Sequence, residues 1–237
     1  MVKKRIWELD ALRGLNLLWM LVIHFIYDIV VLFPLWQWTF PGWYAFWVRV
    51  CSVLFLMISG ICVNLGTNSL RRGLTVLGGG LIVTAVTVTL YLTGLCDASV
   101  IIYFGILHCV GICMLLWPLV RKCPGWLMIP MGLGLVFLGK YLDTLTVNTY
   151  WLIPLGLCPA EFESSDYFPL IWNLGFFLMG AGAGRYLYRK KTSLLPKVKQ
   201  VLPLRFLEFC GRHTLLIYLL HQPVLAAIAA AWYYTLS

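Results

Sequence analysis

The stretch "ELDALRGLNLLWMLVIHFIYDIVVLF", residues 8–33, is long and apolar enough to cross a bilayer, yet it holds four ionisable residues. A spanning helix needs about 20 mostly apolar residues. Each charged residue near the centre of such a helix costs about 2.5–3.5 kcal/mol on insertion scales. A helix that served only as an anchor would not need charged residues. The presence of Asp10, Arg13, His24 and Asp28 therefore predicts a protein-lined interior or a functional site.

The composition of the whole chain is that of an integral membrane protein. Of its 237 residues 61% are hydrophobic and 11% charged, with a mean hydropathy of +0.87, whereas soluble domains carry about 25% charged residues. Continuous apolar runs without two-residue alternation favour helices over a barrel. We therefore predict an all-α, polytopic transmembrane helix bundle, a single domain over 1–237. Seven spans are expected, at 8–33, 43–65, 72–94, 101–120, 125–142, 167–188 and 206–233.

The basic residues orient the predicted bundle. Most of the 18 Lys and Arg fall on one side of the spans, and positive loops stay cytoplasmic. This places the protein in the cell membrane with its N-terminus inside and, after seven crossings, its C-terminus outside. The acidic segment 144–166 is then a structured outer loop. The net charge of +9 is a topology signal with some attraction to anionic lipid, and it does not indicate a nucleic-acid partner.

The polar residues of the first helix share one face. Arg13 and His24 are eleven residues apart, which is about three turns and about 16 Å of rise, and Asp28 lies four residues beyond His24. A stripe of ionisable groups faces the bundle interior or a water-filled cavity. Asp28 is expected to orient His24, which could then exchange a proton near neutral pH. The alternative is structural: an interfacial ion pair at Asp10 and Arg13, and an interhelical hydrogen bond at His24.

Polar residues at a similar predicted depth occur on three other spans. They are Arg49 on the second, His108 on the fourth and His221 on the last, where Gln222 and a proline follow. Any one of them could be a satisfied core residue. Together they favour a site that contains His24.

The cysteines and glycines support packing rather than metal chemistry. Cys109 and Cys113 share a helix face, but two thiols make a poor zinc site, so no metal is predicted. Cys96 and Cys158 both fall on the predicted outer side, where a disulfide is left open. "GAGAG" at 180–184 is expected to allow close helix packing, since no strand precedes it as a nucleotide fingerprint requires.

The opening "LDALRG" and the Arg13-to-His24 spacing resemble the first helix of the transmembrane acyltransferases. Within that group the chain is most similar to bacterial relatives of the heparan-α-glucosaminide N-acetyltransferase catalytic domain. "FLMISG" (55–60), "YFGILHCVGI" (103–112), "DYFPLIWNLGFFLMGAGAGRYLY" (166–188) and "GRHTLLIYLLHQPVL" (211–225) resemble later motifs of that family.

The resemblance implies transfer of an acetyl group from acetyl-CoA, bound on the cytoplasmic side, to a sugar amine or hydroxyl on the far side. His24 would be the general base, with Asp28, His108 and His221 in the catalytic group. Candidate binding residues for the CoA thioester are Arg13, Arg71, Arg72 and Arg185, and for a saccharide or glycolipid acceptor Arg49, Trp43 and Gln222. Membrane lipid is a further partner, and a homodimer is left open.

Two positions depart from the lysosomal branch of the family. Its first loop has a histidine in the pattern H-A-P-W-x-G, where this chain reads "TFPGW" (39–43), and its second helix has an aspartate where this chain has Arg49. The runner-up interpretation is a small-molecule transporter or proton relay built on the same buried residues, followed by a sensor or accessory protein. A transporter would favour a two-fold repeat, which the sequence does not show.

Overall fold

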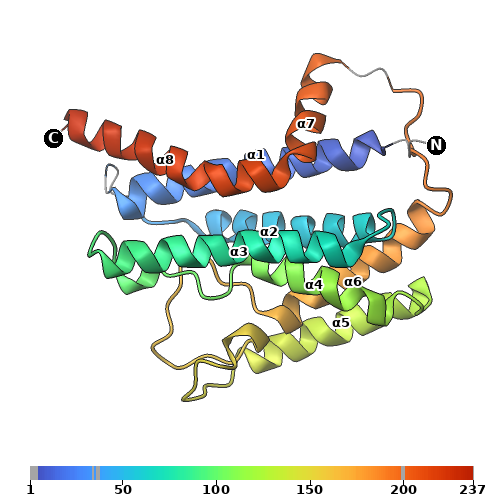
Figure 1. Ribbon diagram of the computed structural model, residues 1–237, viewed down its shortest axis with the longest axis horizontal. Coiled ribbons are helices and arrows are strands. Elements are labelled where there is room, and N and C mark those ends of the chain that lie inside the picture. The colour runs from blue at the N-terminus through green and yellow to red at the C-terminus, as the bar shows by residue number, and fades with distance from the viewer. Residues whose placement is uncertain (1–4, 34, 36–37, 199–200, 237) are drawn as a thin grey trace. The chain divides into compact units, whose positions relative to one another are not determined.

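The computed structural model describes residues 5–33, 35, 38–198 and 201–236, and in this part of the chain the regular structure is helical throughout (Figure 1). The chain divides into two compact units. The first comprises residues 1–55 and 192–237, and the second comprises residues 56–191. The division falls inside one long helix, α2 (Gly42–Val63). The all-α prediction is confirmed, and the single-domain assignment stays a prediction.

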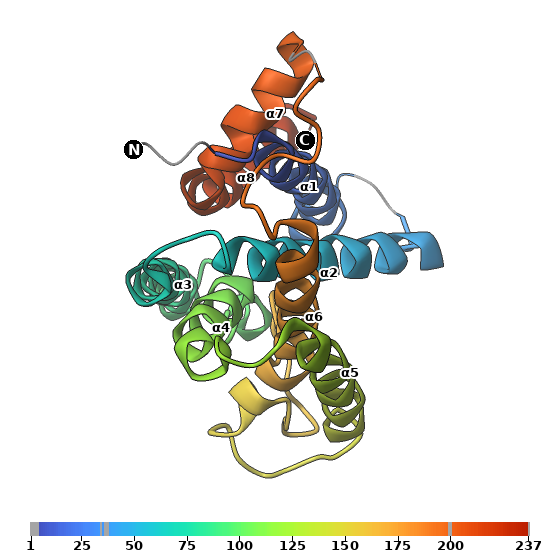
Figure 2. The same ribbon diagram turned by 90° about the vertical axis from the view of Figure 1, so that its right-hand side faces the viewer.

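The first unit is built around α1 (Trp7–Tyr27), which continues as a π-helical turn, η1 (Asp28–Leu32). The unit also contains the start of α2, α7 (Leu202–Arg212) and α8 (Thr214–Leu236). Figures 1 and 2 show α8 running along α1. Hydrogen bonds tie α1 to α2: the Asn16 side-chain amide donates to the Cys51 carbonyl at 3.0 Å, and the Tyr44 hydroxyl donates to the Ile23 carbonyl at 3.0 Å.

Two glycines let α7 cross α1 closely. A Cβ atom added at Gly14 would collide with the Leu207 carbonyl oxygen, and one at Gly211 would collide with the Asp10 carbonyl oxygen. Helix axes can approach this closely only where side chains are absent from the contact. The crossing therefore fixes the polar start of α1 against the end of α7.

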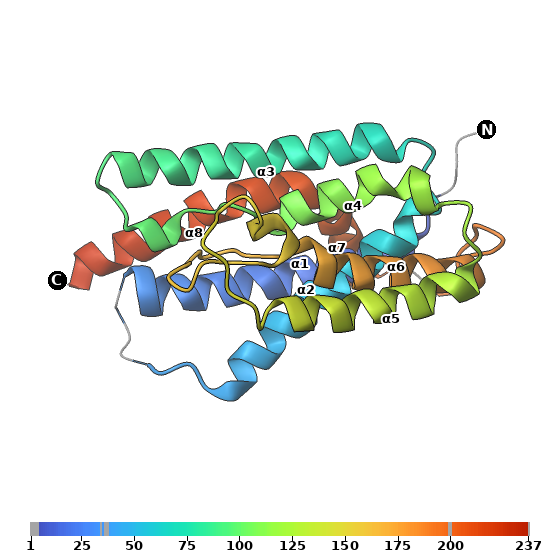
Figure 3. The ribbon, with the colours of Figure 1, turned by 90° about the horizontal axis from the view of Figure 1, so that it is seen from below.

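The second unit packs its helices as two pairs joined by the end of α2. The pairs are α3 (Ser69–Leu92) with α4 (Ile106–Val120), and α5 (Gly125–Leu142) with α6 (Leu170–Leu187), as Figure 3 shows. The predicted packing role of "GAGAG" is confirmed: a Cβ at Gly180 would collide with the Met57 carbonyl oxygen, and one at Gly182 would lie 2.8 Å from the Gly125 carbonyl oxygen.

The segment between α5 and α6 is a structured loop, as predicted. It includes the short turn η3 (Ile153–Leu155) and a bridge between Thr146 and Cys158. The loop is tied to the segment before α4, which contains the turn η2 (Ala98–Val100). Ser164 donates a hydrogen bond to the Ile101 carbonyl at 2.8 Å, and the Asp166 carboxylate accepts one from the Ile106 amide at 3.2 Å.

Several predicted span limits were wrong in detail. The last predicted span, 206–233, is two helices, because the chain leaves the helical path at His213 (φ −104°, ψ 20°). The fourth begins five residues later than expected, at Ile106, because residues 101–105 are not helical. Among the described residues five helices are long and apolar enough to cross a membrane. Of the other two predicted spans, α4 has 15 residues, and α6 contains Asn173 and Arg185.

Candidate functional site

The strongest candidate site lies in the first unit, where the outer half of α1 meets α8. His24 and Asp28 lie four residues apart on one face of α1, and His221 and Gln222 come from α8. At Asp28 the winding changes from α to π, with the Phe33 amide donating to the Asp28 carbonyl at 2.8 Å. Such π-turns widen a helix locally and are frequent at functional sites. The sequence predicted an uninterrupted helix here.

His24 and His221 face each other edge to face, with ring centroids 4.9 Å apart. The Nδ1 atom of His24 lies 2.9 Å from the Met20 carbonyl oxygen, and Nδ1 of His221 is hydrogen-bonded to the Tyr218 carbonyl oxygen. A carbonyl oxygen can only accept, so in both rings Nδ1 carries the proton. In the neutral rings both Nε2 atoms therefore hold a lone pair and can receive a proton.

The carboxylate of Asp28 is fully buried beside this pair. Its Oδ1 atom accepts a hydrogen bond from the side-chain amide of Gln222 at 2.6 Å. The expectation that Asp28 orients His24 is corrected, because the backbone carbonyl of Met20 holds Nδ1 of His24. The position of that carbonyl, one turn earlier on the same helix, follows from helix geometry alone.

Three buried polar atoms of this cluster have no hydrogen-bond partner among the described residues. They are Asp28 Oδ2, His221 Nε2 and Gln222 Oε1. Buried polar groups without partners are rare and call for an explanation. Since each of the three is an acceptor, with His221 in the tautomer derived above, the cluster is suited to a ligand group that donates hydrogen bonds.

Arg13 lies at the other end of the same stripe, within a network of charges. Its guanidinium lies 3.4 Å from Asp10 and 3.5 Å from the Gly211 carbonyl oxygen. Asp10 also pairs with Arg5 and Arg212, each at 3.8 Å. These contacts match the structural alternative for Asp10. The side chain of Arg13 is 18% exposed.

His108 lies in the second unit, and its ring is fully engaged. Its Nδ1 atom accepts a hydrogen bond from the Gly105 amide at 3.2 Å, so its proton is on Nε2, which lies 3.3 Å from the Thr84 hydroxyl oxygen. The ring also packs against Gly80, where an added Cβ would lie 2.9 Å from Nδ1. This environment favours a structural role for His108 at the start of α4.

The predicted acceptor-binding residues lie in different settings. Gln222 belongs to the cluster described above. Arg49 is exposed on α2, and Trp43 is about half exposed beside Trp38, with ring centroids 5.8 Å apart. Trp43 belongs to an aromatic stretch, residues 36–47, of which residues 36–37 lie outside the described residues. An exposed aromatic surface also fits a membrane interface, where tryptophan and tyrosine are enriched.

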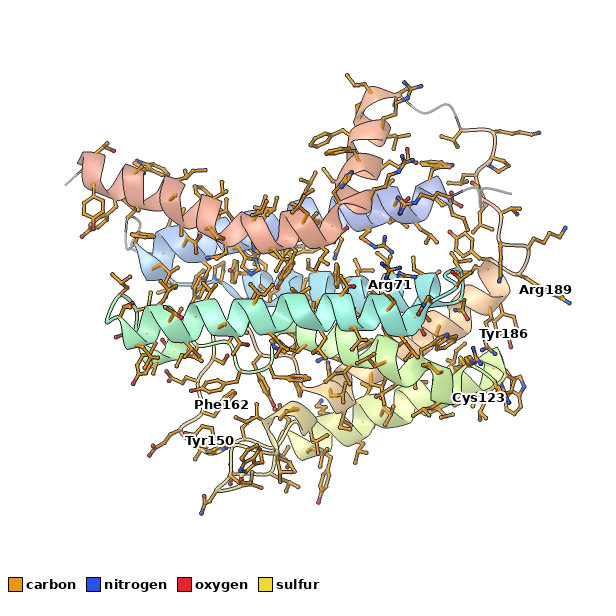
Figure 4. The ribbon with its side chains drawn as sticks, viewed as in Figure 1. Arg71, Cys123, Tyr150, Phe162, Tyr186 and Arg189 are labelled. Carbon is orange, nitrogen blue, oxygen red and sulfur yellow. The ribbon has the colours of Figure 1, made fainter. Side chains whose placement is uncertain are left out.

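The predicted CoA-binding arginines of the second unit gather at one end of it. Arg71 and Arg72 lie in the first turn of α3, and Arg185 lies in the last turn of α6. In Figure 4, Cys123, Tyr186 and Arg189 mark this basic end, and Tyr150 and Phe162 lie toward the opposite end of the unit. Arg71 is exposed, and Arg185 is partly buried beside a cavity.

Cysteine pairing plays no part in the described structure, where all eight cysteines are free thiols. Cys158 instead donates a hydrogen bond to the Tyr167 hydroxyl, with 3.1 Å between the two atoms. Cys96 and Cys158, whose pairing the sequence left open, are separate thiols in this structure.

Sequence reasoning missed the groups that hold the histidines in place. Met20 and Tyr218 act through their backbone carbonyls, so their side chains carry no signal of this role. Spacing could have identified them, since a histidine ring can reach the carbonyl three or four residues earlier on its helix. It also missed Tyr44, which binds the Ile23 carbonyl next to His24.

The comparison with protein families gives one match. Residues 5–223 match the family described as heparan-alpha-glucosaminide N-acetyltransferase, catalytic. The chain belongs to this family. No curated protein and no solved structure matches the chain.

The match covers the candidate site and confirms the resemblance stated above. The heparan-alpha-glucosaminide N-acetyltransferase catalytic family is one of membrane acetyltransferases, which agrees with the apolar helices of this structure. The matched range includes His24, Asp28, His221 and Gln222, and it ends at residue 223, directly after the two site residues of α8.

Proposed function

We propose that this protein transfers an acetyl group from acetyl-CoA to an amine or hydroxyl of a saccharide or glycolipid, with His24 as the general base. The observation that carries the proposal is the lone pair on Nε2 of His24, fixed by the hydrogen bond of Nδ1 to the Met20 carbonyl. It stands beside a second imidazole and a buried carboxylate. The proposal rests also on membership of a membrane acetyltransferase family.

The cluster offers each of its groups a distinct role. Asp28 Oδ2 and Gln222 Oε1 would accept hydrogen bonds from the acceptor's N–H or O–H groups and so hold it beside His24. The lone pair of His24 Nε2 would take the proton as the acceptor attacks, and the imidazolium would return it to the departing thiolate. Acetyl-CoA would supply the activated acetyl thioester.

Arg13 would act on the donor's phosphates rather than on the reacting atoms. Helix rise places it about 16 Å from His24, on the end of α1 that is predicted to face the cytoplasm. Its neighbours Arg5 and Arg212 add positive charge there. Arg71, Arg72 and Arg185 are further candidates for these phosphates, from the basic end of the second unit.

The test separates binding from chemistry. Purified protein is titrated with CoA by calorimetry, and transfer is measured with radiolabelled acetyl-CoA and a membrane extract as acceptor source. His24→Ala should abolish transfer and leave CoA affinity unchanged, because a general base acts on the acceptor. Arg13→Ala should weaken CoA binding. The control is Arg205→Ala, which removes an exposed cation of α7 outside the pairs that Asp10 makes and should leave CoA affinity unchanged.

Two results would count against the mechanism. Transfer at the wild-type rate by His24→Ala would remove His24 as the base. Absence of CoA binding by the wild-type protein would favour the transporter interpretation, with the same polar cluster serving as a path for protons or solute.

A further inference from the structure

Helix α7 lies across α1 rather than along it. Figures 1 and 2 show α7 standing across the direction of α1 within the first unit. The two helices touch near the start of α1, where a Cβ added at Gly14 or Gly211 would collide with the backbone of the other helix. Since α1 is a candidate membrane span, a helix that crosses it lies close to the plane of the membrane.

The crossing falls at the level of the lipid headgroups. The apolar stretch Trp7–Leu32 has 26 residues. At 1.5 Å of rise per residue it is about 39 Å long, whereas the hydrocarbon core is about 30 Å thick. The start of α1, where Asp10 pairs with three arginines, belongs outside the hydrocarbon, because charges within it are costly. Since Gly211 packs against Asp10, the end of α7 lies at that same level.

One face of α7 is apolar and has no cover in the first unit. Leu202, Phe206 and Phe209 are 81%, 54% and 57% exposed. With 3.6 residues per turn the three side chains fall within about 60° of one another, on the side of the helix opposite Gly211. Gly211 is buried. The face that points away from α1 is therefore a narrow apolar stripe, and Arg205 lies exposed along its edge.

The acidic groups around α7 are buried, so the exposed charge is positive. Glu208 is 7% exposed and pairs with Arg212. Glu8 is 6% exposed, and its carboxylate accepts hydrogen bonds from the Ser193 hydroxyl at 2.8 Å and from the Leu194 amide at 2.7 Å. These bonds fix the segment before α7 to the start of α1.

Two basic residues of this region remain open to a ligand. Lys197 and Arg205 are exposed, and neither forms an ion pair within the described ranges. A negatively charged surface would complement them. An apolar stripe edged by basic residues is typical of a helix that lies in a membrane surface.

We propose that α7 is an interfacial helix that binds the anionic lipid of one leaflet. Leu202, Phe206 and Phe209 enter the boundary between headgroups and acyl chains. Arg205 and Lys197 contact headgroup phosphates, as basic segments beside a membrane span do at an anionic surface. Neither residue belongs to the group proposed for CoA, so the inference holds whether or not the chain transfers acetyl groups.

The experiment is photolabelling of the full-length protein in nanodiscs of phosphatidylcholine and phosphatidylglycerol. Either lipid carries a diazirine near the start of one acyl chain, and peptide mass spectrometry locates the adducts. We expect adducts on residues 202–209, with a preference for phosphatidylglycerol. Arg205→Ala should lower that preference by about fivefold, the factor that one basic residue contributes near an anionic surface. Lys197→Ala should lower it too.

The apolar stripe is tested separately from the charge. Phe206→Ser should reduce labelling of α7 by both lipids, because it removes apolar area from the face that enters the membrane. Phe206→Leu keeps an apolar side chain there and should retain the labelling. Adducts on α8, counted in the same digest, report the amount of folded, membrane-inserted protein. Equal labelling of α7 in the two variants would overturn the assignment of this face.

The matched control for the charge is Arg121→Ala, which removes an exposed arginine at the end of α4, in the second unit. It should leave the lipid preference at α7 unchanged. A loss equal to that of Arg205→Ala would show attraction to general surface charge and would overturn the proposal. Unlabelled α7 beside a labelled α8 would overturn it as well, and a doubled mass in native mass spectrometry would then identify a second copy of the chain as the cover.

Discussion

The buried histidines of the two units differ in whether both ring nitrogens have hydrogen-bond partners. In the first unit, Nδ1 of His221 is bound to a carbonyl and its Nε2 has no hydrogen-bond partner in the described structure. In the second unit, both nitrogens of His108 have partners, the Gly105 amide and the Thr84 hydroxyl. Both residues are buried, at 8% and 5% exposure, so burial does not separate them.

The difference teaches that a histidine's role in a membrane helix depends on whether a lone pair is left over. The acceptor nitrogen of His108 is hydrogen-bonded to the Gly105 amide at the start of α4, so it is not available to a ligand. His221 and His24 each use the donor nitrogen on a carbonyl of their own helix, which leaves the acceptor nitrogen for chemistry. A neutral imidazole that presents a lone pair is a base, and one whose lone pair is already bonded is a structural link.

The largest expected effect comes from His221→Phe, which keeps a ring of similar size opposite His24 and removes the Nε2 acceptor. If this nitrogen holds or receives a proton of the acceptor, acetyl transfer should fall by about 100-fold or more. The thermal unfolding midpoint should fall only modestly, since Nε2 has no partner among the described residues and the hydrogen bond lost is that of Nδ1 to the Tyr218 carbonyl. Radiolabelled transfer and fluorescence-detected thermal unfolding measure the two effects on one preparation.

His213→Phe is the matched control, because His213 is exposed at the junction of α7 and α8, with its ring beside Phe209. It should transfer at the wild-type rate. If His221→Phe also transfers at that rate, the unpartnered nitrogen has no chemical role, and the contrast between the two units fails.

A smaller effect, on stability instead of chemistry, is expected for His108→Ala. The substitution leaves the buried Gly105 amide without its acceptor, which should cost about 1–3 kcal/mol of unfolding free energy. The Thr84 hydroxyl loses the ring but keeps its hydrogen bond to the Ile102 carbonyl at 2.6 Å. Transfer per folded molecule should stay near the wild-type value. Denaturant unfolding in detergent, combined with the transfer assay on the folded fraction, checks both statements.

Thr84→Val is a companion variant that leaves the Gly105 contact intact and removes the hydrogen bonds of the hydroxyl to His108 Nε2 and to the Ile102 carbonyl. It should lower the unfolding free energy and leave transfer per folded molecule near the wild-type value. A His108→Ala protein of wild-type stability that had lost transfer would place His108 with the catalytic residues, as the sequence first indicated.

The sequence predicted the helical architecture well, because apolar periodicity and run length are local properties. It also placed His24 and Asp28 on one face of α1, and it grouped them with His221 and Gln222, which the structure brings beside them. It could not predict the π-turn at Asp28, whose hydrogen bonds have no residue signature in "DIVVL". It could not separate α7 from α8 either, because the break at His213 accompanies the contact between Gly211 and Asp10, distant in sequence.

The roles of individual polar residues were harder to predict than their positions. Depth along a helix gave His108 and His221 the same status, but depth does not reveal which carbonyl, amide or hydroxyl completes a ring's hydrogen bonds. Asp28 was assigned to His24 by the i, i+4 rule, whereas the tertiary structure brings the Gln222 amide to its carboxylate at 2.6 Å. Arg49, predicted to line the site, is exposed on α2.

The smallest expected effect concerns a second closed network, in the loop before α6. Cys158 donates to the Tyr167 hydroxyl, which in turn donates to the Ile153 carbonyl at 2.8 Å. Burial raises the pKa of the Cys158 thiol, and burial together with Cys158 raises the pKa of Tyr167. Like His108, these groups have their hydrogen bonds filled within the protein, so they should resist both ionisation and reaction.

Cys158 should therefore react slowly with maleimide in the folded protein. The thiolate is the reactive form, and a raised pKa leaves less of it at any given pH. At pH 8 we expect the rate at Cys158 to be lower than in the unfolded chain, where an ordinary pKa of about 8.5 applies. The raised pKa also sets the pH dependence of stability. The thiol ionises at a lower pH in the unfolded chain than in the folded protein, so the contribution of Cys158 to folding stability falls as the pH rises above the pKa of the unfolded thiol.

Peptide mass spectrometry after timed labelling measures the rate at Cys158 separately from the other cysteines. Tyr167→Ala should speed the labelling, because it removes a large side chain in contact with the sulfur atom and so lessens the burial that raises the thiol pKa. It should leave acetyl transfer unchanged. Equal labelling rates in the folded and the unfolded protein would show that the Cys158–Tyr167 network does not protect the thiol. Filled hydrogen bonds would then fail to distinguish this network from the histidine pair.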